Sequence, residues 1–383
     1  MQVFLEETAK LCYTERTVHL RYPQVFVTNS GSYKERVGMS KKKRRKKKRF
    51  RWIKFLFEIA VLAALACALF VAYKFTQITR TDIQEEQLVV NSSIPEDEWN
   101  RMKKYTTVAF FGVDSRTGAL ESGANSDTIM VCSIDNETKK VQLASVYRDT
   151  YLDTTAGEYR KCTEVYSIGG AQQSVSMLNK NLDLNITDYV TVNFQALVEL
   201  VDLFGGVDIN LSEGEVVWLN GYLVEEREVL GKECEDVPGP GLQHLNGMQA
   251  LAYSRIRYIG LDYERTERQR TVLEQVMKKA QNSDLLMLND IIDTVLPMVS
   301  TSLSVAEIWK LVSGTGKYTM NETVGFPFEK TTMTVNGSDC VIPINLAENV
   351  SQLHSYLYGS EDYTPSDVVQ EISNQISYTT GIY

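Results

Sequence analysis

Five arginines fall within YSRIRYIGLDYERTERQR, the stretch from Tyr253 to Arg270. Arginines that converge on one place repel one another unless an anion lies between them, and the planar guanidinium group suits phosphate. If a helix starts near Asp262, Arg265 and Gln269 continue the apolar stripe that faces the core on its later turns. The stretch therefore predicts a cleft that binds phosphate, with backbone donors added by the start of the helix.

Arg255 and Arg257 are two residues apart, so their side chains point the same way if this segment is extended. An alternative is that arginines of the stretch pair with nearby acids, as the sequence ERTER permits at spacings of three and four. We expect this alternative to apply more to Arg268 and Arg270 than to the other three arginines.

Two aspartates supply the complementary half of a site. Asp114 and Asp127 lie at the ends of predicted strands, and two close carboxylates hold Mg²⁺ when phosphate oxygens and waters complete its octahedron. Taken alone, an aspartate at a strand end is more often a turn former or a helix cap than a metal ligand. Together with Arg148, at the end of another predicted strand, they predict a site for metal-bound pyrophosphate.

The elements that must position these residues alternate between strands and helices. Apolar runs typical of buried strands lie at Tyr105–Arg116, Ser126–Asp135, Lys139–Asp149 and Tyr189–Phe194. Helical periodicity is found at Thr163–Leu184 and Gln195–Gly206, and further helices are expected after residue 246. This order predicts an α/β domain whose sheet is at least partly parallel.

The charges are divided unevenly along the chain, whose net charge is -9. Up to Lys54 there are 16 Lys and Arg residues against 4 acids, and after it 24 against 45. Between the two parts, FLFEIAVLAALACALFVAY (Phe55 to Tyr73) carries one charge and spans roughly 28 Å, enough to cross a bilayer. The basic run before it predicts a cytoplasmic N-terminus and a single-pass cell-membrane protein whose remainder is extracellular.

An alternative is that the basic run binds nucleic acid, but its position beside the predicted membrane span favours an anchor at lipid headgroups. We expect a membrane partner and no nucleic acid. Because Met39 stands just before the run, we expect translation to start there and residues 1–38 not to be translated. The expected segments are a cytoplasmic segment 1–54, a transmembrane anchor 55–73, an extracellular stalk 74–100, a catalytic domain 101–360 and a tail 361–383.

Cysteines and histidines suggest no further chemistry. Four cysteines follow the anchor and allow three pairings, of which Cys234 with Cys340 is the one expected, while Cys132 is expected to be buried. No cysteine and histidine spacing fits zinc. Neither His244 nor His354 lies beside a nucleophile motif, which argues against a Ser/His/Asp mechanism.

Seven segments resemble, in order, the motifs of the LytR-CpsA-Psr family of bacterial cell-wall enzymes. They are FFGVDSR, NSDTIMVCSID, VQLASVYRDTYL, IGGAQQSVSMLN, YVTVNFQALVELVDLFGGVDINL, HLNGMQALAYSRIR and DYERTERQR. The resemblance implies a central mixed β-sheet flanked by helices, an α-β-α sandwich with an apolar lipid tunnel. It also implies a phosphotransferase that uses Mg²⁺, with Mn²⁺ as the alternative ion. Such an enzyme moves an anionic glycopolymer (teichoic acid, capsule or secondary wall polysaccharide) from polyprenyl pyrophosphate to peptidoglycan.

The resemblance assigns roles residue by residue. It implies metal ligands at Asp114 and Asp127. It implies pyrophosphate-binding arginines at Arg148, Arg255, Arg257 and Arg265. Asp262 matches an acid that acts as base, with Asp149 as an alternative, and Gln269 matches a polar partner that binds substrate beside Arg268.

Two departures from the family pattern affect substrate contacts. Many members have an arginine where this chain has Asn125, so that contact is either missing or supplied by Arg116. Many also have a Lys-x-Asn before the long helix, of which Lys161 is retained and the amide is not.

Two other functions use the same residues. A pyrophosphatase would hydrolyse the lipid carrier linkage with water as acceptor. A membrane-bound regulator of cell-envelope gene expression would only sense wall precursors, and would need neither two metal-spaced acids nor a base.

Overall fold

The computed structural model describes residues 79–383 except 82, 115–119, 121 and 261. The predicted cytoplasmic segment 1–54 and the predicted anchor 55–73 lie outside these residues, as does the expected start at Met39. Of the helices in the described range, none is both long and apolar enough to cross a membrane.

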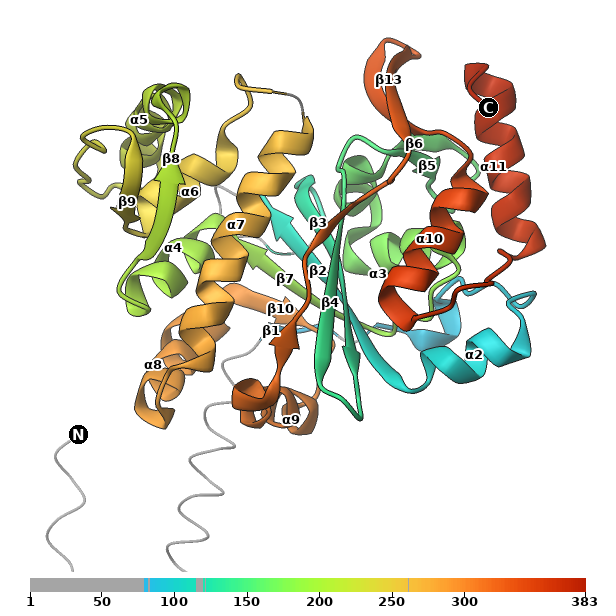
Figure 1. The fold of residues 1–383 in the computed structure, drawn as a ribbon, viewed down its shortest axis with the longest axis horizontal. Helices are drawn as coiled ribbons and strands as arrows, with labels where there is room; N and C mark the ends of the chain where they lie inside the picture. Colours follow the sequence, from blue (N-terminus) through green and yellow to red (C-terminus); the bar gives the residue numbers. More distant parts are fainter. Residues whose placement is uncertain (1–78, 82, 115–119, 121, 261) are drawn as a thin grey trace, which may run out of the picture. The chain divides into compact units, whose positions relative to one another are not determined.

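A mixed sheet, with eight strands among the described residues, forms the centre of the fold (Figure 1). In spatial order its strands are β1 (Thr79–Arg80), β10 (Val299–Thr301), β7 (Asp188–Asn193), β2 (Tyr105–Val113), β3 (Ser126–Asp135), β4 (Lys140–Val146) and β11 (Thr319–Met320), and β12 (Val324–Phe326) also pairs with β4. Strand β2 runs parallel to β7 and antiparallel to β3. The predicted partly parallel sheet is therefore confirmed.

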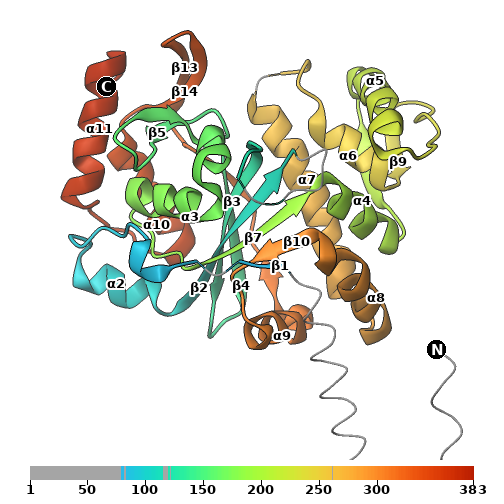
Figure 2. The ribbon, with the colours of Figure 1, turned by 180° about the vertical axis from the view of Figure 1, so that it is seen from behind.

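Helices cover both faces of the sheet, as Figures 1 and 2 show. One group is α2 (Glu96–Met102), α3 (Cys162–Leu182), α10 (Leu346–Tyr358) and α11 (Asp367–Thr380). The other group is α4 (Phe194–Leu203), α5 (Glu213–Leu230), α6 (Gly247–Arg255), α7 (Asp262–Gln281) and α8 (Leu285–Val295), and α9 (Val305–Ser313) follows β10 in the chain. Alternation along β2 sends Ala109 and Phe111 into the core beneath α3, and Phe110 toward the second group. The predicted central sheet flanked by helices is confirmed.

Shorter elements complete the described part of the chain. Three two-stranded antiparallel sheets are β5 (Tyr151–Asp153) with β6 (Tyr159–Lys161), β8 (Val207–Leu211) with β9 (Gly241–Leu245), and β13 (Lys330–Val335) with β14 (Ser338–Pro343). The 3₁₀ turns are η1 (Glu85–Gln87), η2 (Leu296–Met298) and η3 (Thr315–Lys317).

Polar caps fix the starts of the helices that surround the site. The side chain of Asn193 accepts a hydrogen bond from the backbone of Ala196 at the start of α4. Ser212 and Glu215 form a capping box at the start of α5, and another capping box begins α6. Such caps satisfy backbone donors that the helix itself cannot, so each start is fixed by local sequence.

The ends of the described chain correct two predictions. The stalk predicted at 74–100 is folded where the structure describes it, because β1 joins the sheet and the side chain of Glu98 is buried. The peripheral tail predicted at 361–383 contains α11, whose Ile372 and Ile376 belong to the main core. In the tail, the spacing of Val369, Ile372 and Ile376 was an available signal for a helix with a buried face. Polar contacts of both segments with the distant Asp183 also hold them in place.

The predicted disulfide between Cys234 and Cys340 is wrong. Both thiols are free. Cys234 packs with the α4–α6 core, whereas Cys340 lies on β14 and belongs to the core beneath α3. Cys132 is buried as predicted, and burial raises the pKa of its thiol to about 12.

Candidate active site

The ends of three strands meet at one edge of the central sheet. Asp114 follows β2, Asp127 is the second residue of β3, and Arg148 follows β4. Strand β3 pairs antiparallel with both β2 and β4. The start of β3 therefore lies between the end of β2 and the end of β4. The structure therefore brings together the three residues that the strand pattern singled out.

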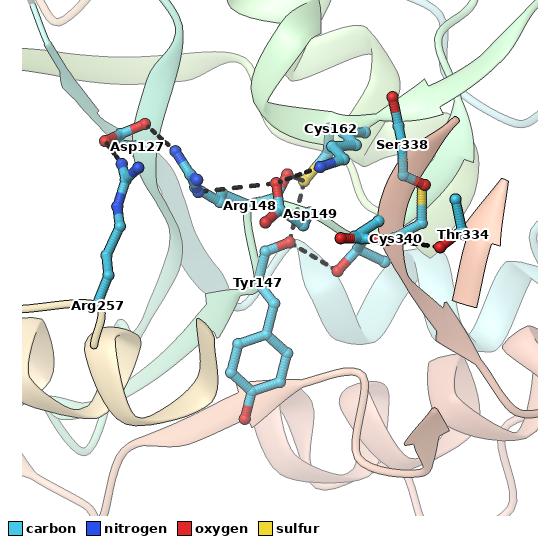
Figure 3. Close-up of polar contacts among 12 residues, drawn as sticks. Asp127, Tyr147, Arg148, Asp149, Cys162, Arg257, Thr334, Ser338 and Cys340 are labelled. Atoms are coloured by element: carbon cyan, nitrogen blue, oxygen red, sulfur yellow. Dashed lines mark hydrogen bonds and ion pairs between the residues drawn. The ribbon is translucent and has the colours of Figure 1, made fainter. Parts of the chain in front are cut away.

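Asp127 is the anionic centre of this edge (Figure 3). Its Oδ1 accepts a hydrogen bond from Nη1 of Arg148 at 2.7 Å, and its Oδ2 accepts one from Nη2 of Arg257 at 2.9 Å. Burial raises the pKa of Asp127, but the charges of Arg148, Arg265 and Arg257 outweigh it and hold that pKa below its usual value. We name Asp127 and these three arginines the arginine cluster.

A cavity of about 430 Å³ opens beside the arginine cluster. Charged and amide side chains at the strand ends, at and just after the end of α6, and on the first turns of α7 line its polar part: Asp114, Asp127, Arg255, Arg257, Arg265 and Gln269. Farther along the same elements its lining is apolar, from Phe110, Met130, Val192, Leu197, Leu251, Val272 and Leu273. Along α7 the change from Arg265 to Leu273 covers roughly 12 Å. The cavity thus suits an amphiphile with an anionic group next to an apolar chain.

Arg255, the last residue of α6, lines the polar part and has acidic partners of its own. It forms an ion pair with Glu226 and a longer one with Glu225, 3.5 Å from Nη2 to Oε2. Its guanidinium carbon also lies 5.2 Å from the ring centroid of Phe194 and 5.6 Å from that of Tyr222. Arg255 is therefore held by α5 at the cavity wall.

Glu226 is a site residue that the sequence did not suggest. Its side chain is 1% exposed and lines a second cavity, of about 130 Å³, together with Asp114 and Arg255. Burial, aided by the charges of Glu225 and Asp114, raises the pKa of Glu226 although Arg255 opposes the shift. Glu226 lies four residues after Tyr222 on α5, and this helical spacing was the available signal.

The family of the chain follows from a match that covers most of its length. The LytR_cpsA_psr family model matches residues 69–353. The chain belongs to the LytR_cpsA_psr family. The resemblance drawn from the seven motifs is thereby confirmed.

Several relatives are named as transferases. The polyisoprenyl-teichoic acid–peptidoglycan teichoic acid transferase TagU of Bacillus licheniformis is 28% identical over 283 residues, covering 72% of this chain and 85% of the relative. The TagU protein of Halalkalibacterium halodurans is 31% identical over 211 residues, covering 54% of this chain and 64% of that relative. A solved structure, TagT bound to LIIa-WTA, is 20% identical, with a TM-score of 0.51, and covers 74% of this chain and 93% of its own. At that identity it supports the fold.

Arg268 of this LytR_cpsA_psr protein does not line the cavity, contrary to its predicted substrate contact. It is 6% exposed, and its Nε donates to Oε1 of Glu215 at 2.9 Å. Its Nη1 and Nη2 donate to the carbonyls of Ile256 and Ile259, at 3.2 and 3.1 Å. The alternative in which Arg268 pairs with an acid therefore describes its contacts, although the acid belongs to α5 and not to ERTER.

Asp149 and Lys161 lie next to the arginine cluster without lining the cavity. Oδ1 of Asp149 is 3.4 Å from Nζ of Lys161 and 3.7 Å from Nε of Arg148 (Figure 3). Both residues thus help to fix Arg148. Helix α7 begins at Asp262, near the predicted start, but the side chain of Asp262 and the whole of Arg116 lie outside the described residues.

The residues at the strand ends fit a divalent cation that a ligand helps to hold. Among the described side chains, no group of three or more His, Cys, Asp and Glu could hold a metal. Asp114 and Asp127 supply two carboxylates to one cavity, and each carboxylate oxygen of Asp127 that accepts an arginine bond has a second lone-pair direction. Two carboxylates completed by phosphate oxygens and water are a set that Mg²⁺ accepts.

Proposed function

We propose that this protein is a phosphotransferase that attaches an anionic glycopolymer, carried on polyprenyl pyrophosphate, to peptidoglycan. The observation that carries the proposal is the cavity that joins the arginine cluster to an apolar end. A polyprenyl pyrophosphate has the same order of parts, a doubly anionic group followed by hydrocarbon. The transferase names of the family relatives support the same substrate class and acceptor.

The apolar end of the cavity is the proposed entrance of a lipid tunnel. Phe110 is 36% exposed although it lies on a central strand, because it faces this space. Covering such a side chain with the first isoprene units removes apolar surface from water, which is favourable by about 25 cal/mol per Å². The lipid would thereby place its pyrophosphate among the arginines.

In the proposed reaction the oxygen of a peptidoglycan sugar hydroxyl attacks the phosphorus that bears the glycopolymer. The bond from that phosphorus to the bridging oxygen breaks, and polyprenyl phosphate leaves. Arg148, Arg257 and Arg265 bind the diphosphate oxygens and stabilise the charge that develops on them. The proton of the hydroxyl passes to a carboxylate, for which Asp262 and Asp149 are the two candidates.

Asp114 and Asp127 would hold the metal ion, Mg²⁺ or in its place Mn²⁺. When bound, the ion would neutralise charge on the diphosphate and orient it. We also propose that the segment 55–73 anchors the protein in the cell membrane, with residues 1–54 in the cytoplasm and the domain outside. This arrangement presents the cavity to a lipid-linked donor.

The test uses the full chain in detergent with a lipid-linked polymer and peptidoglycan. Asp114→Ala should abolish metal-dependent release of polyprenyl phosphate, while Asp362→Ala, which removes an exposed carboxylate elsewhere, should not. Undiminished release by Asp114→Ala would contradict the metal assignment. Product analysis separates transfer, which leaves polymer covalently on peptidoglycan, from hydrolysis, which leaves free phosphorylated polymer.

A further inference from the structure

Two stacked aromatic rings are exposed at the surface near the arginine cluster. Trp218 of α5 and Tyr258 of the α6–α7 connection lie with ring centroids 4.3 Å apart and planes inclined by 24°. Trp218 is 37% exposed and Tyr258 is 70% exposed. Large aromatic surface left in water is unfavourable for folding alone, so a stacked and exposed pair indicates a binding surface.

Each ring of the pair is close in sequence to a residue that lines the cavity. Tyr258 directly follows Arg257, whose guanidinium contacts Asp127. On α5, Tyr222 lies four residues after Trp218, on the same helical face, and lines the cavity beside Arg255. The stacked rings are therefore about one helical turn along α5 from the polar part of the cavity.

Arg268 holds the two elements together. Its hydrogen bonds to the carbonyls of Ile256 and Ile259 fix the residues on either side of Arg257 and Tyr258. Its Nε fixes Glu215, which lies three residues before Trp218 on α5. One buried side chain thus sets the position of the rings relative to the arginine that contacts Asp127.

We propose that Trp218 and Tyr258 form a stacking platform for a sugar ring, the pyranose joined to the pyrophosphate of the donor. This inference rests on the proposed function and adds a carbohydrate subsite to it. The faces of pyranose rings carry C–H groups with partial positive charge, which are attracted to the negative faces of aromatic rings. The order of surfaces, apolar cavity, arginine cluster and aromatic pair, matches the order of lipid, pyrophosphate and sugar in such a donor.

Two ligands that differ only in the sugar test the platform. Farnesyl pyrophosphate and farnesyl-pyrophosphoryl-N-acetylglucosamine are titrated calorimetrically into the full chain in detergent. We expect the sugar to tighten binding roughly tenfold in the unsubstituted protein, which corresponds to about 1.4 kcal/mol. Trp218→Ala and Tyr258→Ala should each reduce this ratio toward one and leave the affinity for farnesyl pyrophosphate unchanged.

The ratio of the two affinities distinguishes a platform from a structural contact. If the rings only hold the α6–α7 connection in place, both ligands will weaken together through Arg257, and the inference is overturned. Trp218→Phe and Tyr258→Phe keep a ring and should retain most of the sugar effect. Tyr378→Ala, which removes an aromatic side chain that is 83% exposed on α11, should leave the ratio unchanged.

Two results in the unsubstituted protein separate this inference from the proposed function. Equal affinities for the two ligands would overturn the platform and leave the diphosphate site standing. No binding of farnesyl pyrophosphate at all would overturn the proposed function and the platform with it.

Discussion

Two buried polar clusters of this protein differ in how their charges are balanced. The first, which we name the terminal cluster, joins Glu98, Asp183, His354, Ser360 and Tyr363. Nδ1 of His354 lies 2.7 Å from Oε1 of Glu98, and the hydroxyl of Ser360 donates to the same carboxylate. The Tyr363 ring stacks on His354 at 4.0 Å between centroids, and its hydroxyl donates to Asp183 at 2.8 Å.

The arginine cluster has the opposite balance. Three arginines, Arg148, Arg257 and Arg265, act on the carboxylate of Asp127, and Arg148 also contacts Asp149. Arginines gathered at a cavity repel one another, and an anion that enters among them is stabilised by all three. Burial of charged groups therefore does not by itself mark a functional site. The terminal cluster satisfies its own carboxylates and holds the fold together, whereas the arginine cluster favours an anionic ligand.

Removing a carboxylate from the terminal cluster should have the largest effect on stability. Glu98→Ala leaves the His354 ring and the Ser360 hydroxyl without their acceptor, and we expect the free energy of unfolding to fall by about 3–5 kcal/mol. Thermal unfolding followed by circular dichroism measures the change, with Glu96→Ala on the exposed side of α2 as the control. The folded fraction should bind farnesyl pyrophosphate as before. Normal stability, or a ligand defect without a stability defect, would contradict the comparison.

The corresponding change in the arginine cluster should affect the reaction most. Arg265→Ala removes a guanidinium group that is 1% exposed at the cavity, and we expect kcat for release of polyprenyl phosphate to fall about 10²–10³-fold. The loss of stability should be smaller than for Glu98→Ala, because two arginines remain to neutralise Asp127. Arg265→Lys, which keeps the charge without the planar fork, should give an intermediate rate. An unchanged kcat together with a large loss of stability would place Arg265 with the structural residues.

Arg268 forms hydrogen bonds with an acid and two carbonyls outside the cavity. Its replacement tests whether these contacts affect ligand binding at the arginine cluster. Arg268→Ala removes hydrogen bonds to Glu215, Ile256 and Ile259, and should lower the free energy of unfolding by about 1.5–3 kcal/mol. The affinity for farnesyl pyrophosphate should fall several-fold because Arg257 is no longer fixed. The free energy of unfolding and the affinity are measured on the same preparation. Arg268→Lys should restore neither quantity fully, since one ammonium group cannot replace three diverging donors. An affinity that stays normal while stability falls would show that Arg268 does not position Arg257.

The strand ends and the helix stripe could be predicted because each depends on neighbours in sequence. Apolar runs end at Asp114, Asp127 and Arg148, and strands that pair must end at common edges. Arg265 continues a stripe whose period is fixed by the helix itself. These features determine the sheet, the flanking helices and most of the cavity lining.

Partners far apart in sequence could not be predicted in the same way. Tyr363 and Asp183 are separated by 180 positions, and no local pattern indicates that they meet. The polar segment after residue 360 therefore resembles a tail, although its polar groups find buried partners. The ion pair of Glu226 with Arg255 was not predicted for the same reason. Arg268 likewise pairs with Glu215, on another helix, and not with an acid of its own helix.

The smallest expected effect concerns the pH dependence of the terminal cluster. Burial raises the pKa of Glu98, but hydrogen bonds from His354 and Ser360 outweigh it, so its pKa in the folded protein lies below the ordinary value. A carboxyl group with a lowered folded pKa stabilises the protein above its unfolded pKa of about 4.3, and this contribution is lost as the pH falls through the folded pKa. Each unit of difference is worth about 1.4 kcal/mol. Thermal unfolding of the unsubstituted protein should therefore approach that of Glu98→Gln as the pH is lowered from 6 toward 3. A gap between the two proteins that stays constant over this range would show that Glu98 stabilises the fold without titrating.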